Sequence, residues 1–149
     1  MTSPEPADIE TFLSYRLSIV SRLINRRSTR YFTERHGLTL AEWRAMAQIA
    51  TGRATSVQAI STRTCSDKGQ ISRATATLLD KGLVSALPDP ADRRTIHFEL
   101  TPAGQAIHDE ILPMRADENA MIASLMSAGE LALFHDILDR IQVHLDRLD

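Results

Sequence analysis

The stretch DKGQISRATATLLDKGLVSALPDPADRRTIHFELTPAG, residues 67–104, combines a helical pattern with a hairpin pattern. Asp67 is a favourable N-cap and Gly82 a favourable stop, which predicts a helix between them. Two runs with strand character, 83–87 and 95–100, then surround a turn that contains proline. Because an isolated hairpin is marginally stable in water, this one must pack on helices.

The residues before this stretch predict three helices. Apolar side chains recur at three- and four-residue steps through residues 9–36, which indicates one long helix ended by Gly37. Two shorter helices follow, and each begins with a Ser/Thr-x-x-Glu/Gln pattern that caps the free amides of the first turn. The same pattern precedes the last helix, so the expected capping pairs are Thr39 with Glu42, Thr55 with Gln58 and Ser127 with Glu130.

The expected helix between Asp67 and Gly82 has two different faces. Its inner stripe is apolar and consists of Ile71, Ala74, Leu78 and Leu79. Its outer face is small and polar, with few acids, and carries Lys68, Gln70, Ser72, Arg73, Ala76 and Thr77. A helix that is only solvated more often carries Glu and Lys four residues apart, so this face favours close contact with another molecule.

The last third of the chain predicts two further helices. Thr101-Pro102 begins the first of them, because proline favours the first turn, and Pro113 inside it is expected to produce a kink. Apolar residues continue through the second helix to the end of the chain. Terminal helices this apolar need a partner, and a second copy of the chain is the simplest one.

Composition and charge narrow the class of protein. The chain has 149 residues, 43% hydrophobic and 24% charged, and no apolar run approaches the ~20 residues of a membrane span. The polar N-terminus lacks the pattern of a signal peptide and the single Cys65 excludes an internal disulfide, so a cytoplasmic location is expected. Residues 1–100 carry 14 Lys and Arg against 10 Asp and Glu, whereas residues 101–149 carry 3 against 9, which favours a basic surface for a polyanion.

The expected elements follow one another as a short helix, a turn, a second helix and a hairpin. This is the element order of a winged helix-turn-helix. We therefore predict a mainly α fold with a small β-hairpin wing, in a single domain over residues 1–149. The DNA-binding lobe is expected at 37–104, flanked by N- and C-terminal dimerisation helices at 9–36 and 105–148.

Residues 67–104 resemble the recognition helix and wing of the MarR family of transcriptional regulators, and residues 38–50 resemble the helix that leads into its winged module. The specific motif is DRR at 92–94 followed by LTPAG at 100–104. In element order the resemblance covers residues 9–148. It implies a homodimer that binds a pseudo-palindromic site on double-stranded DNA, commonly as a repressor.

The outer face of the recognition helix and the tip of the wing are the expected DNA contacts. Gln70 and Arg73 have the reach and the donor patterns to read base edges in the major groove. By the resemblance, Arg94 matches the arginine that enters the minor groove, with Arg93 on a phosphate. Asp92 is expected to hold an arginine in place rather than to meet DNA. The full expected set is Ser66, Lys68, Gln70, Ser72, Arg73, Thr77, Arg93 and Arg94.

Structural roles for the same arginines stay open. Arg93 and Arg94 can be solvated turn residues, and Arg73 can form a salt bridge with Asp67 or Asp80. Such a salt bridge does not explain why the whole outer face lacks bulky apolar residues.

The resemblance also implies a small aromatic acid or phenol that releases the protein from DNA. The expected lining of its site is Tyr15, Arg16, Trp43 and Met46, with Arg16 as the partner of a carboxylate. The favoured alternative is structural: the stem of Arg16 packs on apolar neighbours while its head reaches water, and Trp43 is a core residue.

No metal and no cofactor are expected, because the five histidines lack the close spacing of zinc ligands. Cys65 precedes the recognition helix, where oxidation of a reactive thiol would disturb DNA docking. An inert small residue is the favoured interpretation, since peroxide sensors of the family usually carry their cysteine in the first helix.

An enzyme is not expected. The sequence contains no Gly-rich phosphate loop, no G-x-S-x-G motif and no Cys-His pairing with supporting context. The alternative to a DNA-binding regulator is a helical homodimeric interaction module without specific DNA binding.

Overall fold

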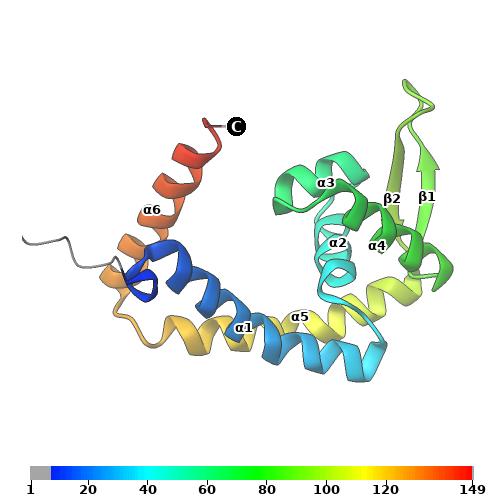
Figure 1. Cartoon of the computed structure of the whole chain (residues 1–149). Helices are drawn as coiled ribbons and strands as arrows, with labels where there is room; N and C mark the ends of the chain where they lie inside the picture. Colours follow the sequence, from blue (N-terminus) through cyan, green and yellow to red (C-terminus); the bar gives the residue numbers. More distant parts are fainter. Residues whose placement is uncertain (1–7, 149) are drawn as a thin grey trace, which may run out of the picture. The chain divides into compact units, whose positions relative to one another are not determined.

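The computed structural model describes residues 8–148 of the chain (Figure 1). They divide into two compact units, with the boundary between Asp109 and Glu110. Residues 1–7, which belong to the polar N-terminus interpreted as not being a signal peptide, lie outside the described residues. That residues 1–149 form a single domain stays a prediction.

The first unit contains the elements predicted for the DNA-binding lobe and the long helix before it. In chain order they are η1 (Ile9–Thr11), α1 (Leu13–His36), α2 (Leu40–Ala50), α3 (Val57–Thr64), α4 (Lys68–Asp80), β1 (Val84–Pro88), β2 (Ile96–Leu100) and the start of α5 (Pro102–Ala123). The second unit contains the rest of α5 and α6 (Ala128–Leu145). A mainly α fold with one antiparallel hairpin among the described residues confirms the predicted fold class.

Most helix ends lie where the sequence predicts them. Thr39 and Glu42 form both hydrogen bonds of a capping box at the start of α2, and Ser127 and Glu130 do the same for α6. Gly37 ends α1 with a left-handed φ of 63°, a conformation that costs glycine little. Local side-chain chemistry therefore sets these boundaries.

The long first helix begins later than predicted. Residues 9–11 form the separate η1, in which the Asp8 carboxylate accepts a hydrogen bond from the amide of Glu10. Phe12 then has an extended backbone, with φ −70° and ψ 133°, so α1 starts at Leu13. One extended residue does not interrupt the apolar periodicity, which is why the pattern predicted a continuous helix.

The cap of α3 is one residue further along than predicted. Ser56 is the N-cap, and its hydroxyl accepts a hydrogen bond from the amide of Ala59 at 3.2 Å. The predicted capping box of Thr55 with Gln58 is therefore wrong. The Thr55 carbonyl oxygen instead accepts a bond from the amide of Phe98 at 2.8 Å, which ties the start of α3 to β2.

The buried side of α4 packs against α2, α3 and β1. Ile71 and Leu78 are fully buried and Ala74 is nearly so, as predicted. Leu79, predicted to be in the same stripe, is 37% exposed, and Thr75 takes its place in the core. The Thr75 hydroxyl donates to the carbonyl of Ile71 at 3.0 Å, so its polarity is satisfied within the helix.

The two strands pair antiparallel, with Val84 opposite Leu100 and Pro88 opposite Ile96. Each strand begins one residue later than predicted. Phe98 is the buried residue of β2 and attaches the hairpin to the helices. Figure 1 shows the hairpin extending beyond α3 and α4.

The base of the hairpin is locked to the start of α5. The Thr101 hydroxyl donates to the carbonyl of Gly82 at 2.7 Å and accepts from the amide of Gly104 at 3.1 Å. A Cβ atom at Gly104 would collide with the backbone carbonyl of Leu83. The glycine of the LTPAG motif is therefore required for this close approach.

The end of α1 and the start of α5 join the same core. The Trp43 ring stacks on Phe32, with centroids 6.1 Å apart, and on His108, with centroids 5.6 Å apart. The Glu42 carboxylate lies 2.8 Å from the Lys81 ammonium, which connects the beginning of α2 to the end of α4. These contacts give α4 a fixed base.

The second unit is helical and has a largely exposed apolar surface. α5 is continuous through Pro113, and α6 exposes Leu133, Phe134, Val143 and Leu145. Within residues 8–148, no single helix has both the length and the apolar character to cross a membrane, and only α5 and α6 together, as a pair bent by 108°, pass a test of length and composition.

Candidate nucleic-acid interface

The predicted major-groove residues lie on the side of α4 that faces away from the core. The side chains of Lys68, Gln70, Ser72 and Arg73 are exposed, and that of Thr77 is half-buried. The Asp67 carboxylate caps the helix by accepting from the amide of Gln70 at 2.8 Å. The cap fixes the first turn of α4, and with it the position of Gln70.

Arg73 lies beside small residues. The 3.6-residue period places Gly69 and Ala76 on its face of the helix. A Cβ atom at Gly69 would lie 3.3 Å from the Arg73 guanidinium and 3.1 Å from the Asp67 carboxylate, so the arginine extends back over the glycine. Within residues 8–148 Arg73 forms no ion pair, and the alternative salt bridges to Asp67 and Asp80 are not observed.

Two of the predicted contacts have partners inside the protein. The Thr77 hydroxyl donates to the carbonyl of Arg73 at 3.0 Å. The Ser66 hydroxyl lies 2.9 Å from that of Thr64 and precedes the cap of α4. Both hydroxyls still have capacity to accept a hydrogen bond.

The tip of the wing, residues 89–95, is shaped by two carboxylates. Asp89 accepts from the amides of Ala91 and Asp92 at 2.7 and 3.0 Å. Asp92 accepts from the amide of Arg94 at 3.0 Å and from the hydroxyl of Thr95 at 3.1 Å. Asp92 thus holds the backbone of the arginine turn rather than a guanidinium group.

Arg93 and Arg94 project from this tip. Both side chains are exposed, and in the part of the chain that the structure describes neither forms an ion pair. Their charge is therefore available to an external anion. The tip follows β1, and β1 packs on α4, so both predicted contact regions lie on adjacent elements of one unit.

His97 of β2 also belongs to this arrangement, and no sequence pattern predicted its role. Its ring Nε2 lies 2.8 Å from the Asp89 carboxylate, and its Nδ1 lies 2.8 Å from the Thr55 hydroxyl. Hydrogen bonds from His97 first, and then from the amides of Ala91 and Asp92, hold the pKa of Asp89 below its ordinary value. Such a long-range bond has no periodic sequence pattern.

The four residues predicted to line a ligand site are not brought together within the unit. Trp43 and Met46 are core residues, whereas Tyr15 and Arg16 are exposed near the start of α1. Trp43 packs on Phe32, and about 25 Å of helix separates that residue from Tyr15. Trp43 thus packs as a core residue of this unit, and its role in a ligand site stays a prediction.

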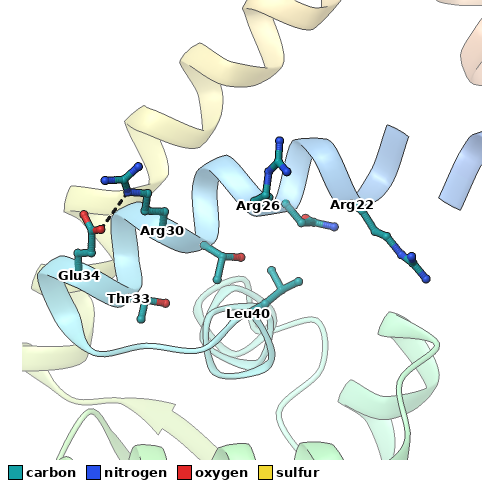
Figure 2. A pocket seen from close by; sticks show the side chains of 8 residues that line it. Arg22, Arg26, Arg30, Thr33, Glu34 and Leu40 are labelled. Carbon is teal, nitrogen blue, oxygen red and sulfur yellow. Dashed lines mark hydrogen bonds and ion pairs between the residues drawn. The ribbon is translucent and has the colours of Figure 1, made fainter. Parts of the chain in front are cut away.

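Arginines also line a groove on α1 that includes none of the residues predicted to bind a ligand. A groove of about 520 Å³ lies between α1 and the start of α2, lined by Arg22, Asn25, Arg26, Thr29, Arg30, Thr33, Glu34 and Leu40. Figure 2 shows its arginines along α1, with Leu40 of α2 facing that helix. Arg30 pairs with Glu34 at 2.9 Å, while Arg22 and Arg26 form no ion pair among residues 8–148.

Cys65 is exposed at the C-terminal cap of α3, with a left-handed φ of 48°. Its Sγ lies 3.9 Å from the carbonyl of Thr62. Over residues 8–148, no group of three His, Cys, Asp or Glu side chains is placed to hold a metal ion.

Comparisons with known proteins show which solved structures share this fold. No curated protein sequence matches the chain. The MarR/EmrR family transcriptional regulator from Acinetobacter sp. ADP1 is similar over 95% of this chain and 99% of its own, with a TM-score of 0.86 and 20% identity. A mutant MarR from E. coli, complexed with operator DNA, is similar over 91% of this chain and 99% of its own, with a TM-score of 0.77 and 22% identity.

The PcaV transcriptional regulator from Streptomyces coelicolor, in complex with its natural ligand, is similar over 92% of this chain and 96% of its own, with a TM-score of 0.75 and 20% identity. Such likenesses show a shared winged-helix fold. Residues 38–96, from the residue before the α2 cap to the start of β2, match the sequence model of the MarR family. The sequence match to the MarR family thus covers residues 38–96, and the structural likenesses show the winged-helix fold over most of the chain.

Proposed function

We propose that the chain is a homodimeric transcriptional regulator that binds a specific, pseudo-palindromic site on double-stranded DNA. The observation that carries this proposal is the pair of adjacent contact regions: Arg73 among small residues on α4, and Arg93 and Arg94 on the tip. Arginine reads guanine in the major groove, and inserted arginine is favoured in a narrow, negative minor groove. The operator DNA bound by the MarR relative supports the same chemistry.

The proposal of a dimer rests on apolar side chains that are exposed in the single chain. Leu13, Leu17 and Val20 are exposed on α1, and α6 is exposed along most of its apolar residues. A second copy would cover such surfaces, and two-fold symmetry would set the two α4 helices about one helical turn of DNA, ~34–36 Å, apart. Sedimentation at micromolar concentration should give twice the mass of one chain. A monomer under these conditions would contradict the proposal.

DNA binding is tested on a duplex selected from random sequence by the wild-type protein. Arg73→Ala and Arg94→Ala should each weaken binding by about tenfold or more, since a good base contact contributes roughly 1–3 kcal/mol. Arg140→Ala on α6 removes the same charge outside the proposed contacts and should leave binding unchanged. If the wild type shows no salt-sensitive duplex binding at all, the result favours the alternative of a homodimeric interaction module without specific DNA binding.

We further propose repression that is released by a small aromatic acid or phenol, the effector class that the family resemblance implies. That the PcaV regulator, a structural neighbour, is seen in complex with its natural ligand supports the existence of an effector. Tyr15, Arg16, Trp43 and Met46 are the sequence-based candidates for the site. The α1 groove is a second candidate, because Arg22 and Arg26 there can pair with a carboxylate. Benzoate should raise the melting temperature of the wild type. If Arg16→Ala abolishes this rise, the sequence-based site is correct. If Arg26→Ala abolishes it, the α1 groove is the site.

A further inference from the structure

The His97 side chain bridges two parts of the protein that are distant in sequence. One ring nitrogen contacts the Thr55 hydroxyl before α3, and the other contacts the Asp89 carboxylate at the tip of the wing, each at 2.8 Å. A neutral ring with its hydrogen on Nε2 satisfies both contacts, donating to Asp89 and accepting from Thr55. The ring therefore serves as one donor and one acceptor in a fixed place.

The backbone near His97 is anchored in the helical part of the unit. His97 forms an isolated antiparallel bridge with Ser56, and the amide of Phe98 donates to the carbonyl of Thr55 at 2.8 Å. The middle of β2 is thus held by the segment that starts α3. The imidazole extends this attachment from the middle of the strand to the tip of the wing.

Apart from the bond to His97, the hydrogen bonds described at the tip lie within residues 89–95. The strand pairing ends at Pro88 opposite Ile96, and beyond it backbone hydrogen bonds connect Asp89 with Thr95 and Thr95 with Asp92. The Asp89 carboxylate organises the tip, because it accepts hydrogen bonds from two amides of the turn and also contacts His97. A two-stranded hairpin of this length is marginally stable without such support.

We propose that His97 is a positioning residue for DNA recognition: through Asp89 it fixes the direction of the tip, and so the place of Arg94 relative to α4. The proposal rests on the proposed DNA-binding function. His97 itself does not contact DNA in this account. It acts through a carboxylate that orders the amides of Ala91 and Asp92, and Asp92 in turn holds the amide of Arg94.

The chemistry of the ring defines the test variants. His97→Leu keeps similar bulk and removes both hydrogen bonds. His97→Gln keeps one donor and one acceptor about as far apart as the ring nitrogens, so it should rescue most of the effect. Glu99→Leu is the matched control, because Glu99 is exposed on the same side of β2 and its side chain has no hydrogen bond among residues 8–148.

Binding to the selected duplex should weaken about five- to tenfold in His97→Leu, the size expected from the net contribution of one ordinary hydrogen bond. His97→Gln should bind within about twofold of the wild type, and Glu99→Leu should bind like the wild type. The decisive comparison is the double variant. If His97 acts through Arg94, His97→Leu has no further effect once Arg94→Ala is present, whereas a general loss of folding would weaken both backgrounds equally.

Hydrogen exchange without DNA tests the local part of the proposal. The amides of Ala91 and Asp92 should exchange faster in His97→Leu, while amides of α4 stay protected as in the wild type. Unchanged exchange at the tip, or equal losses of binding in both Arg94 backgrounds, would overturn the proposal. A wild type that fails to bind any duplex would overturn the proposed function instead, and the exchange result would still decide whether His97 orders the tip.

Discussion

The recognition helix α4 and the tip of the wing both carry exposed arginines, but different interactions hold the two regions in place. α4 is held by burial, with Ile71 and Leu78 fully inside the core. The tip lies outside the core and is shaped by hydrogen bonds to Asp89 and Asp92. Apolar burial is insensitive to pH and is shared by many contacts, whereas a carboxylate-centred turn depends on single groups and on their charge. Changes in the two regions should therefore have different signatures.

The largest effect is expected from Leu78→Ala, which empties a fully buried position beneath α4. Such truncations cost about 3 kcal/mol through lost burial and the remaining cavity. The free energy of unfolding, measured in urea, should fall by that amount. Leu79→Ala is the neighbouring control, because Leu79 is 37% exposed and should cost less than about 1 kcal/mol. Equal losses at both positions would contradict the assignment of the buried face.

Gly104→Ala tests the base of the wing. The new methyl group would meet the backbone carbonyl of Leu83, which cannot turn aside as a side chain can. A cost of about 2 kcal/mol in urea unfolding is expected from the forced backbone shift. Gly129→Ala in α6 is the control, because a Cβ there meets nothing and alanine favours a helix. A neutral Gly104→Ala would show that the close approach is not real.

Gly69→Ala should separate stability from binding on α4. Alanine favours a helix over glycine by up to about 1 kcal/mol, but the capping carboxylate of Asp67, 3.1 Å from the new Cβ atom, must shift slightly, so the melting temperature should change little. The methyl group would lie against the Arg73 guanidinium on the face proposed to approach DNA, so duplex binding should weaken. Improved binding together with improved stability would contradict the proposed role of this small-residue surface.

The smallest effect is expected at the tip and should depend on pH. The folded state lowers the pKa of Asp89, mainly through His97 and then through two amides. The ionised carboxylate therefore stabilises the folded state above the unfolded pKa, near pH 4, and this contribution disappears as the pH falls through the lowered folded pKa. The difference in unfolding free energy between the wild type and Asp89→Asn should be constant near neutral pH and shrink below about pH 4. A difference independent of pH would exclude this role of the carboxylate.

The same contrast explains what could be predicted from the sequence. Features of α4 follow local rules, so the cap at Asp67 and the buried Ile71 and Leu78 were predicted correctly. Thr75 was missed because its hydroxyl is satisfied by its own helix backbone, which the apolar pattern does not record. The cap at Ser56 was missed because Thr55 is engaged by β2.

The support of the wing tip could not be predicted, since it joins Thr55 to His97 across 42 positions. The same limit applies to the ligand residues. Periodicity placed Trp43 on an apolar face, but it cannot tell a core position from the wall of a pocket. The groove with Arg22 and Arg26 depends on how α1 meets α2, which is a tertiary feature.

The most direct test of DNA recognition repeats the selection of duplexes from random sequence with the wild type, Arg73→Ala and Arg94→Ala. We expect Arg73→Ala to lose its base preference at one position of each half-site, because α4 reads that base in the major groove. We expect Arg94→Ala to keep that preference and to lose the advantage of an A·T-rich flank, where the minor groove is narrow. Selection of the same sequences with unchanged affinity by all three proteins would contradict the account.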